Sequence, residues 1–530
     1  MKKLPLGVQN FRKIVEGDYV YVDKTNYVYD IINKASYYFL SRPRRFGKSL
    51  LLDTIAEAFS GDKELFKGLY IYDTDYSFER HPVIRLDMSN IVNRTSDTLE
   101  SALREALLKQ INSEGFDISS SLSSDLFKNL IMELHEKYGK RVVVLIDEYD
   151  KPMLDQLNNI EVAEANRDVL RDFYGILKSM DPHLQLTFLT GVTKFTKTSV
   201  FSGLNNLLDI TLMEDYANVC GIEVDALDCY FSEHIDDLAS QKNFKCSSSL
   251  RDEILAWYDG YSWDGETKLI NPFSLLSLFM KKRIYSFWYA SGTPSFLIKL
   301  LKDKPSSYMD LDDLDMSESA LDSVDIRKMS AAPLLFQAGY LTVESVNYDP
   351  PPAYYKLRMP NLEVKEAFNL NIISEFTESD YAFTESSYRK LKQLLQSGNL
   401  EGILSILKSL FASIPHQLHV NREAYYHSIF YAIMTILGFD IEAEISVSGG
   451  RIDATLELAD NVYVMEFKYL DCPVDVSADV KRNAIDKALD AGMAQIVGKG
   501  YANKFKNSNK TVRRAVLVFT GRDEIEMRVE

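Results

Sequence analysis

The stretch YYFLSRPRRFGKSLLL, residues 37–52, predicts a buried strand, a basic loop and the first turn of a helix. It contains Gly47-Lys48-Ser49, the core of a phosphate-binding loop, in which backbone N–H groups at a helix N-terminus bind the anion. Lys48 is expected to neutralise phosphate charge, and Ser49 is expected to bind magnesium.

The loop departs from the usual phosphate-loop pattern at its start. The signature begins with a glycine five residues before Gly47, where this chain has Arg42. Arg44 and Arg45 add positive charge that is available for phosphate contacts. Alone, the stretch fits either a nucleotide site or a basic surface loop that happens to contain Gly-Lys-Ser.

A second stretch, RVVVLIDEYD at residues 141–150, favours the nucleotide site. Its continuous apolar run is typical of a strand buried on both faces of a parallel sheet. Asp147 and Glu148 follow at the carboxyl end, where open α/β sheets place their ligand groups. We expect Asp147 to hold magnesium and Glu148 to orient or deprotonate the attacking water. The alternative is two solvated carboxylates that close a strand.

Other segments of this region have weaker signals. The N-terminal segment up to about Asp30 either covers the nucleotide base or is plain packing. Three polar residues at or after the end of the strand at 184–190 are candidate sensors of the γ-phosphate: Thr190, Thr193 and Lys194. For Thr190, an ordinary strand end is the simpler alternative. Arg167 and Arg171 are candidate arginine fingers in an oligomer, against the simpler interpretation as a solvated helix face.

Length, charge and cysteine content limit the class of protein. A chain of 530 residues predicts two to four domains. The formal net charge of −17 opposes non-specific coating of nucleic acid or of an anionic membrane, so a nucleic-acid site must be local. Four cysteines without a Cys-x-x-Cys pair indicate reduced thiols. We expect a cytoplasmic protein without a membrane partner, because neither a signal peptide nor a membrane-spanning run is present.

The third informative stretch, residues 441–468, predicts three strands joined by tight turns. The midpoint between Asp453 and Glu466 falls inside the second turn, so a symmetric hairpin sets these carboxylates opposite each other. Lys468 shares their face, since it lies two residues after Glu466. By the same arithmetic, Glu444 mirrors Asp453 across the first turn.

This set of charges has a chemical interpretation and a simpler one. Paired carboxylates gather a divalent cation, which stabilises charge on a scissile phosphate, and a lysine positions or deprotonates the attacking water. Glu423, on the preceding predicted helix, is a candidate third acid. The simpler alternative is a salt-bridge ladder on a sheet surface.

With these motifs together, nearly the whole chain resembles bacterial AAA-ATPase-like proteins that have a C-terminal PD-(D/E)XK nuclease domain. The resemblance rests on LPLG at 4–7, VDKT at 22–25, RPRRFGKS at 42–49, LIDEYD at 145–150, FSGLNN at 201–206, GRID at 450–453 and EFK at 466–468. It implies nucleotide roles for Lys48, Ser49, Asp147 and Glu148, and nuclease roles for Asp453, Glu466 and Lys468. Gln495 is similar to an extra polar position that some members use.

The predicted fold class is α/β, in four segments. A P-loop NTPase domain with a parallel sheet, resembling AAA-ATPases, is expected at 1–214, and a helical lid or winged-helix-like region at 215–350. A connecting segment at 351–383 precedes a PD-(D/E)XK nuclease-like domain with an α/β restriction-endonuclease-like fold at 384–530.

The expected function is that of a P-loop ATPase which regulates a Mg-dependent nuclease on the same chain, with ATP and Mg²⁺ (or Mn²⁺) as cofactors. The expected partners are DNA or RNA and further copies of the chain. Two alternatives remain: a nucleotide-dependent switch or scaffold whose nuclease-like domain binds nucleic acid or protein without cleavage, and a nucleotide-binding protein with negligible ATP hydrolysis.

Overall fold

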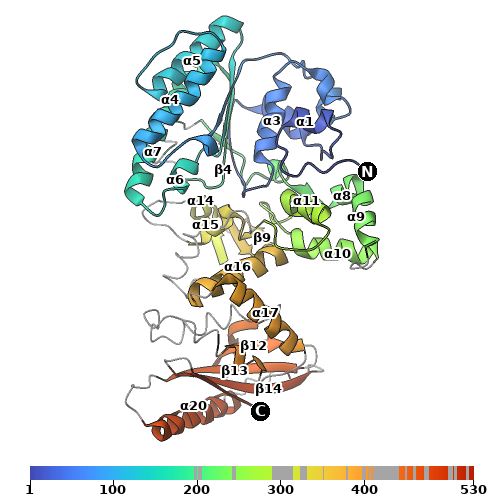
Figure 1. Cartoon of the computed structure of the whole chain (residues 1–530), viewed down its shortest axis with the longest axis vertical. Helices are drawn as coiled ribbons and strands as arrows, with labels where there is room; N and C mark the ends of the chain where they lie inside the picture. Colours follow the sequence, from blue (N-terminus) through green and yellow to red (C-terminus); the bar gives the residue numbers. More distant parts are fainter. Residues whose placement is uncertain are drawn as a thin grey trace. The chain divides into compact units, whose positions relative to one another are not determined.

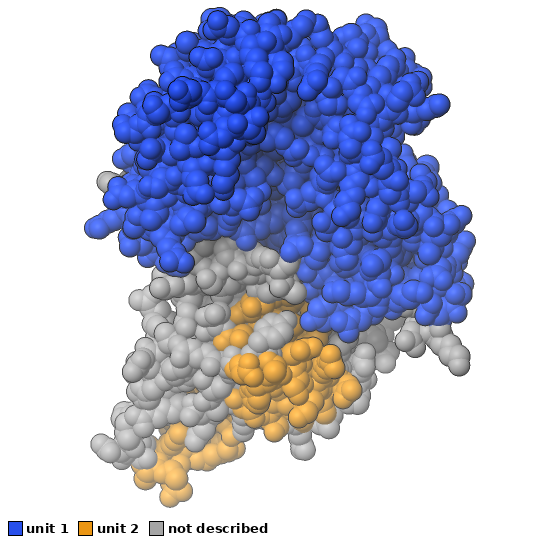
Figure 2. Space-filling model, turned by 45° about the horizontal axis from the view of Figure 1, so that its top comes forward, with its two compact units in different colours: residues 1–296, 312–364 blue, residues 297–311, 365–530 orange. Residues whose placement is uncertain are grey.

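The chain forms two compact units, which Figure 2 shows in separate colours: Met1–Phe296 with Asp312–Val364, and Leu297–Leu311 with Lys365–Glu530. The computed structural model describes residues 1–195, 200, 204, 206–241, 246–288, 314–322, 331–349, 351–377, 380–396, 402–403, 405–407, 409, 441–447, 450–457, 461–470, 477–498, 505, 510–520 and 524–530. The expected domain boundaries at 214, 350 and 383 remain a prediction.

A parallel sheet forms the centre of the first unit, as predicted. Its strands are β1 (Tyr37–Ser41), β2 (Val83–Asp87), β3 (Val142–Asp147), β4 (Leu184–Gly191) and β5 (Leu208–Asp209), in the order β2-β3-β4-β1-β5. All residues of β1 are buried, and so are the first five of β3, because helices cover the sheet. Since β4 lies between β1 and β3, the carboxyl ends of these three strands meet beside the basic loop.

Two groups of helices enclose this sheet. Figure 1 shows α1 (Phe11–Glu16) and α3 (Lys48–Ala58) on one side, and α4 (Ser96–Ser113), α5 (Ser123–Tyr138) and α7 (Ile160–Ser179) on the other. The shorter helices are α2 (Thr25–Lys34) and α6 (Lys151–Leu154). Helix α4 begins at a capping box, in which the Thr95 and Thr98 side chains satisfy N-terminal backbone groups.

The rest of the first unit is helical, followed by a small antiparallel sheet, the winged-helix-like composition that the sequence predicts. Its elements are β6 (Ile222–Glu223), α8 (Val224–Tyr230), α9 (Ser232–Ala239), α10 (Ser247–Tyr258), β7 (Leu269–Ile270), α11 (Pro272–Lys281), β8 (Leu314–Ser317), α14 (Glu318–Asp322), α15 (Ala331–Ala338), β9 (Thr342–Asn347) and β10 (Tyr354–Arg358). The small sheet has the order β8-β10-β9. Helices α8 to α11 share one apolar core around Leu227, Phe231, Leu250 and Leu275.

The second unit contains a five-stranded mixed sheet. Its strands β11 (Ile441–Val447), β12 (Gly450–Glu457), β13 (Asn461–Leu470), β14 (Thr511–Thr520) and β15 (Glu524–Val529) follow chain order, and only β13 and β14 pair in parallel. The helices are α16 (Leu362–Thr377), α17 (Tyr381–Gln396) and α20 (Ala478–Gly498). Helix α20 packs closely on the sheet at Gly492, where a Cβ would lie 2.6 Å from Val516 Cγ1.

The three strands predicted between 441 and 468 are present, each within two residues of its expected ends. Helix α16 starts in the first unit and continues into the second, since the boundary falls between Val364 and Lys365. Within the described parts of the chain, every helix is too short or too polar to cross a membrane.

Candidate functional site

The phosphate loop connects β1 to α3 and places Lys48 at the start of the helix. Gly47 caps α3 with φ +102°, a conformation that favours glycine because it has no Cβ. The Lys48 ammonium donates to the carbonyl oxygens of Arg42 at 2.8 Å and Pro43 at 2.9 Å. Burial lowers the pKa of Lys48, while the nearby Asp147 and Glu148 carboxylates oppose that shift. The Lys48 cation therefore lies against the loop, at the N-terminus of α3, where backbone N–H groups are suited to an anion.

Arg42, which replaces the usual glycine, lies in the core of the first unit and is fully buried. Its guanidinium donates to the carbonyl oxygens of Thr211 at 2.8 Å and Tyr216 at 3.1 Å, and its Cζ lies 4.1 Å from the centre of the Trp263 ring. Burial lowers the pKa of Arg42 to about 10, so the side chain stays charged at neutral pH. Arg42 therefore stabilises the start of the loop through its contacts in the core.

Asp147 brings the ends of three elements together. Its Oδ2 accepts a hydrogen bond from the Ser49 hydroxyl at 2.5 Å, and its Oδ1 accepts one from the Thr190 hydroxyl. A hydroxyl and a carboxylate are hard oxygen donors of the kind that Mg²⁺ prefers, so these residues fit the ion. The sequence predicted Ser49 and Asp147 each as a magnesium ligand, and the structure brings the two side chains together.

Of the three candidate sensor residues, Thr190 is the one that reaches this cluster. Lys194 forms an ion pair with Asp209 on β5, and the Thr193 N–H donates to the buried Asp150 carboxylate at 2.6 Å. Both hold the segment after β4 in place. These contacts give Thr193 and Lys194 a structural role, whereas Thr190, for which the alternative was an ordinary strand end, contacts Asp147.

Glu148 turns into a cavity above the loop. Its φ of +52° is uncommon for a residue with a side chain, and such conformations concentrate at functional sites. Burial raises the pKa of Glu148, and the positive charge of Lys48 opposes the rise. A raised pKa brings a carboxylate closer to the range useful for a general base.

The cavity has a volume of about 400 Å³, within the range of small-molecule sites. Arg44, Arg45, Lys48, Ser49 and Glu148 form its polar part. The other lining residues are Pro5–Gln9, Gly47, Leu50, Lys151, Pro272, Phe273 and Leu276. The cavity thus combines a phosphate-type end with a more apolar end.

Phe273 is the lining residue that sequence reasoning missed. It lies in the first turn of α11, and the Arg45 guanidinium sits 4.0 Å from the centre of its ring. The Asn271-Pro272 pair signals a helix start, since Asn271 caps the helix and proline suits its first position. No signal in the sequence shows that this helix would meet a loop more than 200 residues earlier.

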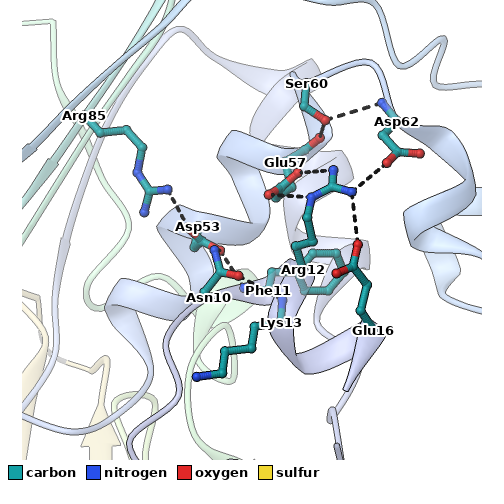
Figure 3. A network of polar contacts seen from close by, with 10 residues as sticks. All are labelled: Asn10, Phe11, Arg12, Lys13, Glu16, Asp53, Glu57, Ser60, Asp62 and Arg85. Atoms are coloured by element: carbon teal, nitrogen blue, oxygen red, sulfur yellow. Dashed lines mark hydrogen bonds and ion pairs between the residues drawn. The ribbon is translucent and has the colours of Figure 1, made fainter. Parts of the chain in front are cut away.

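The N-terminal part of the cavity wall is anchored to α3 by the network in Figure 3. The buried Asp53 carboxylate accepts hydrogen bonds from the Phe11 N–H and from Arg85 Nη1, both at 2.5 Å. Arg12 adds ion pairs to Glu57 at 2.8 Å and Asp62 at 2.9 Å. The segment Pro5–Gln9 is thereby held against the helix that begins at the phosphate loop.

Arg167 and Arg171, the candidate arginine fingers, pair with acids of their own helix. Both bond Asp168 Oδ1 at 3.0 Å, and Arg167 also reaches Glu164. This geometry fits the solvated-helix-face alternative.

In the second unit, β12 and β13 pair as the hairpin arithmetic predicted. Ala454 lies opposite Met465, and continuing that register sets Asp453 opposite Glu466. Asp453 Oδ2 accepts a hydrogen bond from the Phe467 N–H at 2.8 Å. Lys468 Nζ lies 2.7 Å from Glu466 Oε1 and 2.9 Å from Gln495 Oε1 on α20. The chain thus gathers two acids, a lysine and an amide at one place.

The burial of Glu466 follows from the strand pattern. Val462 and Val464 share its face and pack in the core beneath α20. Glu466 is 1% exposed, and a buried carboxylate requires a partner of opposite charge or several hydrogen bonds. Lys468 supplies the positive charge that pairs with Glu466. Glu466 and Lys468 directly follow the apolar core residues along β13, which argues against a salt-bridge ladder on an open surface.

A third acid for this site lies outside the described residues, since Glu423 and its predicted helix are not among them. The register of β11 with β12 places Glu444 opposite Asp453. Among the residues that the structure describes, no three His, Cys, Asp or Glu side chains lie close enough together to hold a metal ion. Asp453 and Glu466 are carboxylates, the donor type that Mg²⁺ and Mn²⁺ prefer, so the two fit such an ion as part of its ligand set.

Comparisons with known proteins give the family of each of the two domains. Residues 5–201 match the family model described as a predicted AAA-ATPase, and residues 421–528 match the model of the PD-(D/E)XK nuclease superfamily. An uncharacterised protein in the vnfD 5′ region of Azotobacter chroococcum mcd 1 is 39% identical over 512 residues, which cover 95% of this chain and 94% of that protein. A structure of the Aeropyrum pernix ORC2 protein in ADPNP–ADP complexes aligns with 66% of this chain and 93% of that one, at 10% identity and a TM-score of 0.26.

Proposed function

The chain belongs to the AAA-ATPase-like family, with a C-terminal domain of the PD-(D/E)XK nuclease superfamily, and we propose that nucleotide in the first domain regulates a nucleic-acid phosphodiesterase in the second. The partners in this proposal are DNA or RNA and further copies of the chain.

In the nucleotide site, Lys48, Arg44 and Arg45 bind phosphate oxygens, and the backbone at Gly47 and the start of α3 adds N–H donors. A magnesium ion held by Ser49 and Asp147 would supply neutralisation of phosphate charge. Glu148 orients the attacking water and accepts its proton, a role that its raised pKa supports.

In the nuclease site, Asp453 and Glu466 are proposed to hold Mg²⁺ or Mn²⁺, which would supply charge stabilisation at the scissile phosphate. Glu423 remains a predicted third ligand. Lys468 positions or deprotonates the attacking water, and Gln495 orients Lys468 through the bond between Oε1 and Nζ.

The observation that carries the proposal is the group formed by Asp453, Glu466 and Lys468 on one face of β12 and β13, with Glu466 buried and paired. A structural ladder of charges would gain little from a buried position, because desolvation outweighs most of the Coulomb gain. A metal-dependent site explains such a position better, because buried charges in proteins are paired or coordinate metals.

Cleavage assays with DNA and RNA in Mg²⁺ or Mn²⁺ test this assignment. We expect Glu466→Ala to reduce cleavage by roughly 100-fold or more, because it removes a metal ligand. The matched control is Glu526→Ala on the edge strand β15, which should cleave as the wild type does. Undiminished cleavage by Glu466→Ala would refute the site.

One observation favours a second candidate, a nucleotide-dependent switch or scaffold that binds without cutting. Both acids already have partners within the protein, since Asp453 accepts from the Phe467 N–H and Glu466 pairs with Lys468. Thermal unfolding with Mn²⁺ separates the two functions. A nuclease should be stabilised by Mn²⁺ in the wild type and not in Asp453→Asn, whereas a binding-only domain should show no Mn²⁺ effect that depends on Asp453.

A further inference from the structure

Glu363 is a buried carboxylate in the first turn of α16, with no exposed surface. Its Oε2 accepts a hydrogen bond from the Ser274 hydroxyl at 2.6 Å, and its Oε1 accepts one from the Trp288 N–H at 2.8 Å. Burying an ionisable carboxylate costs free energy that an apolar residue would not cost. Its position is therefore best explained by what its two bonds hold in place.

The hydrogen bond from the Trp288 N–H connects Glu363 to the phosphate loop. The Trp288 backbone is fixed by Glu363, and its indole Nε1–H donates to the Arg44 carbonyl oxygen at 3.0 Å. Arg44 lines the nucleotide cavity. Two hydrogen bonds thus connect Glu363 to the loop.

The hydrogen bond from the Ser274 hydroxyl connects Glu363 to the same loop through α11. Ser274 follows Phe273, whose ring stacks with the Arg45 guanidinium at 4.0 Å. The start of α11 is held by Asn271, whose side chain accepts from the Phe273 and Ser274 N–H groups at 3.0 and 3.2 Å. Glu363 is therefore connected to Arg44 through Trp288 and to Arg45 through Ser274 and Phe273.

We infer that Glu363 is a positioning residue for Arg44 and Arg45 and that it connects the nucleotide site to α16, the helix that continues into the nuclease unit. This inference rests on the proposed nucleotide site. When phosphate draws Arg44 and Arg45 toward the cavity, Trp288 and Phe273 move with them, and the first turn of α16 follows through Glu363. By thermodynamic reciprocity, a change in α16 alters nucleotide affinity by the same factor.

A double-mutant cycle on ATP affinity tests the positioning role, with a fluorescent ATP analogue as the probe on the full chain. Glu363→Gln keeps the side-chain shape but replaces one of the two acceptor oxygens with an amide NH2, and we expect it to weaken binding by roughly fivefold to tenfold. In an Arg45→Ala background the same change should weaken binding by a clearly smaller factor, because the route through Phe273 is already gone and only the route through Trp288 remains. Additive losses, or no loss in the single variant, would overturn the inference.

Further variants separate this inference from a folding defect and from failure of the proposed function. Trp288→Phe removes only the indole N–H and should reproduce part of the loss, while Glu253→Gln on the exposed face of α10 should change nothing. Nucleotide-free melting temperatures identify variants that fail to fold. If the wild-type chain does not bind the analogue, the nucleotide site is refuted. If the wild type, Glu363→Gln and Trp288→Phe all bind the analogue with equal affinity, only the positioning role is refuted.

The coupling role has its own readout in nuclease activity. If α16 transmits the nucleotide state, Glu363→Gln at saturating ATP should reduce the ATP-dependent change in cleavage rate while cleavage without ATP stays within about twofold of the wild type. An unchanged ATP effect at full nucleotide occupancy would overturn the connection through α16.

Discussion

Arg42 shows why a residue other than glycine is possible at the start of this phosphate loop. Its backbone is not among the positions with positive φ, so a side chain causes no strain there, whereas Gly47 does have positive φ. The guanidinium donates hydrogen bonds to carbonyl oxygens in the 211–217 segment. The loop keeps the backbone shape that an anion requires, and the arginine supplies support that a glycine could not.

Glu148 is the residue on which ATP hydrolysis depends most directly in this account. Glu148→Gln keeps the size of the side chain but removes the base, so we expect ATP turnover to fall by roughly 100-fold or more, with nucleotide affinity within about twofold. Phosphate release and analogue binding measure the two quantities. If the wild type binds ATP and does not turn it over, the chain is a nucleotide-binding protein with negligible hydrolysis.

Glu363 predicts a pH dependence of stability. Burial raises its pKa from 4.5 to about 7, and the hydrogen bonds from Ser274 and Trp288 oppose the rise. Tyr261 is a titratable neighbour whose own pKa rises mainly through burial, with a smaller contribution from Glu363. Because the fold prefers the protonated acid, its contribution is greatest below pH 4.5 and is lost as the pH rises toward 7.

The expected effect is visible when wild type and Glu363→Gln are compared. Between pH 5 and 8 the free energy of unfolding of the wild type should fall relative to that of Glu363→Gln, which cannot ionise, by an amount on the order of 3 kcal/mol or less. Thermal unfolding at several pH values measures the difference. Two curves that remain parallel across this range would contradict a buried, ionisable Glu363.

At the scale of elements, the N-terminal helix α1 is predicted to hold the cavity wall through Asp53. Asp53→Asn removes the charge that binds Arg85 and weakens the bond from the Phe11 N–H. We expect a loss of about 1–3 kcal/mol in stability, because this carboxylate is buried, together with weaker nucleotide binding as Pro5–Gln9 loosens. Asp62→Asn is the control from the same network, since its exposed pair with Arg12 should be worth less than about 1 kcal/mol.

The elements also show how far sequence reasoning reached. The apolar run before Asp147 predicted a doubly buried parallel strand, and β3 is one. The turn positions predicted the register that sets Asp453 opposite Glu466, because a tight hairpin fixes pairing by local geometry. The family resemblance singled out Gln495 as an extra polar position but did not predict its contact with Lys468, and no local rule gives that contact.

What the sequence could not show are contacts between distant segments. The direction of the Arg42 side chain depends on Trp263 and on the 211–217 segment, and the stacking of Arg45 depends on Phe273. Glu363 reads as an ordinary polar residue near a helix start. Its burial follows only from how α11 and α16 pack, which local propensity does not encode.

For the whole molecule, the family membership accounts for an AAA-ATPase-like domain and a PD-(D/E)XK nuclease domain on one chain, and the proposed function connects the two. Nucleotide occupancy in the first domain must then change phosphodiester cleavage in the second. The proposed coupling runs within the first unit from the phosphate loop to the first turn of α16, and continues along that helix.

The cleavage rate with and without ATP, in wild type and in Lys48→Ala, tests this claim most directly. Lys48→Ala removes the cation expected to bind phosphate, so ATP should change the wild-type rate by several-fold or more and leave the Lys48→Ala rate unchanged within about twofold. Glu466→Ala should abolish cleavage in both conditions. Equal wild-type rates with and without saturating ATP, under conditions where ATP binding is measured, would contradict regulation of the nuclease by nucleotide.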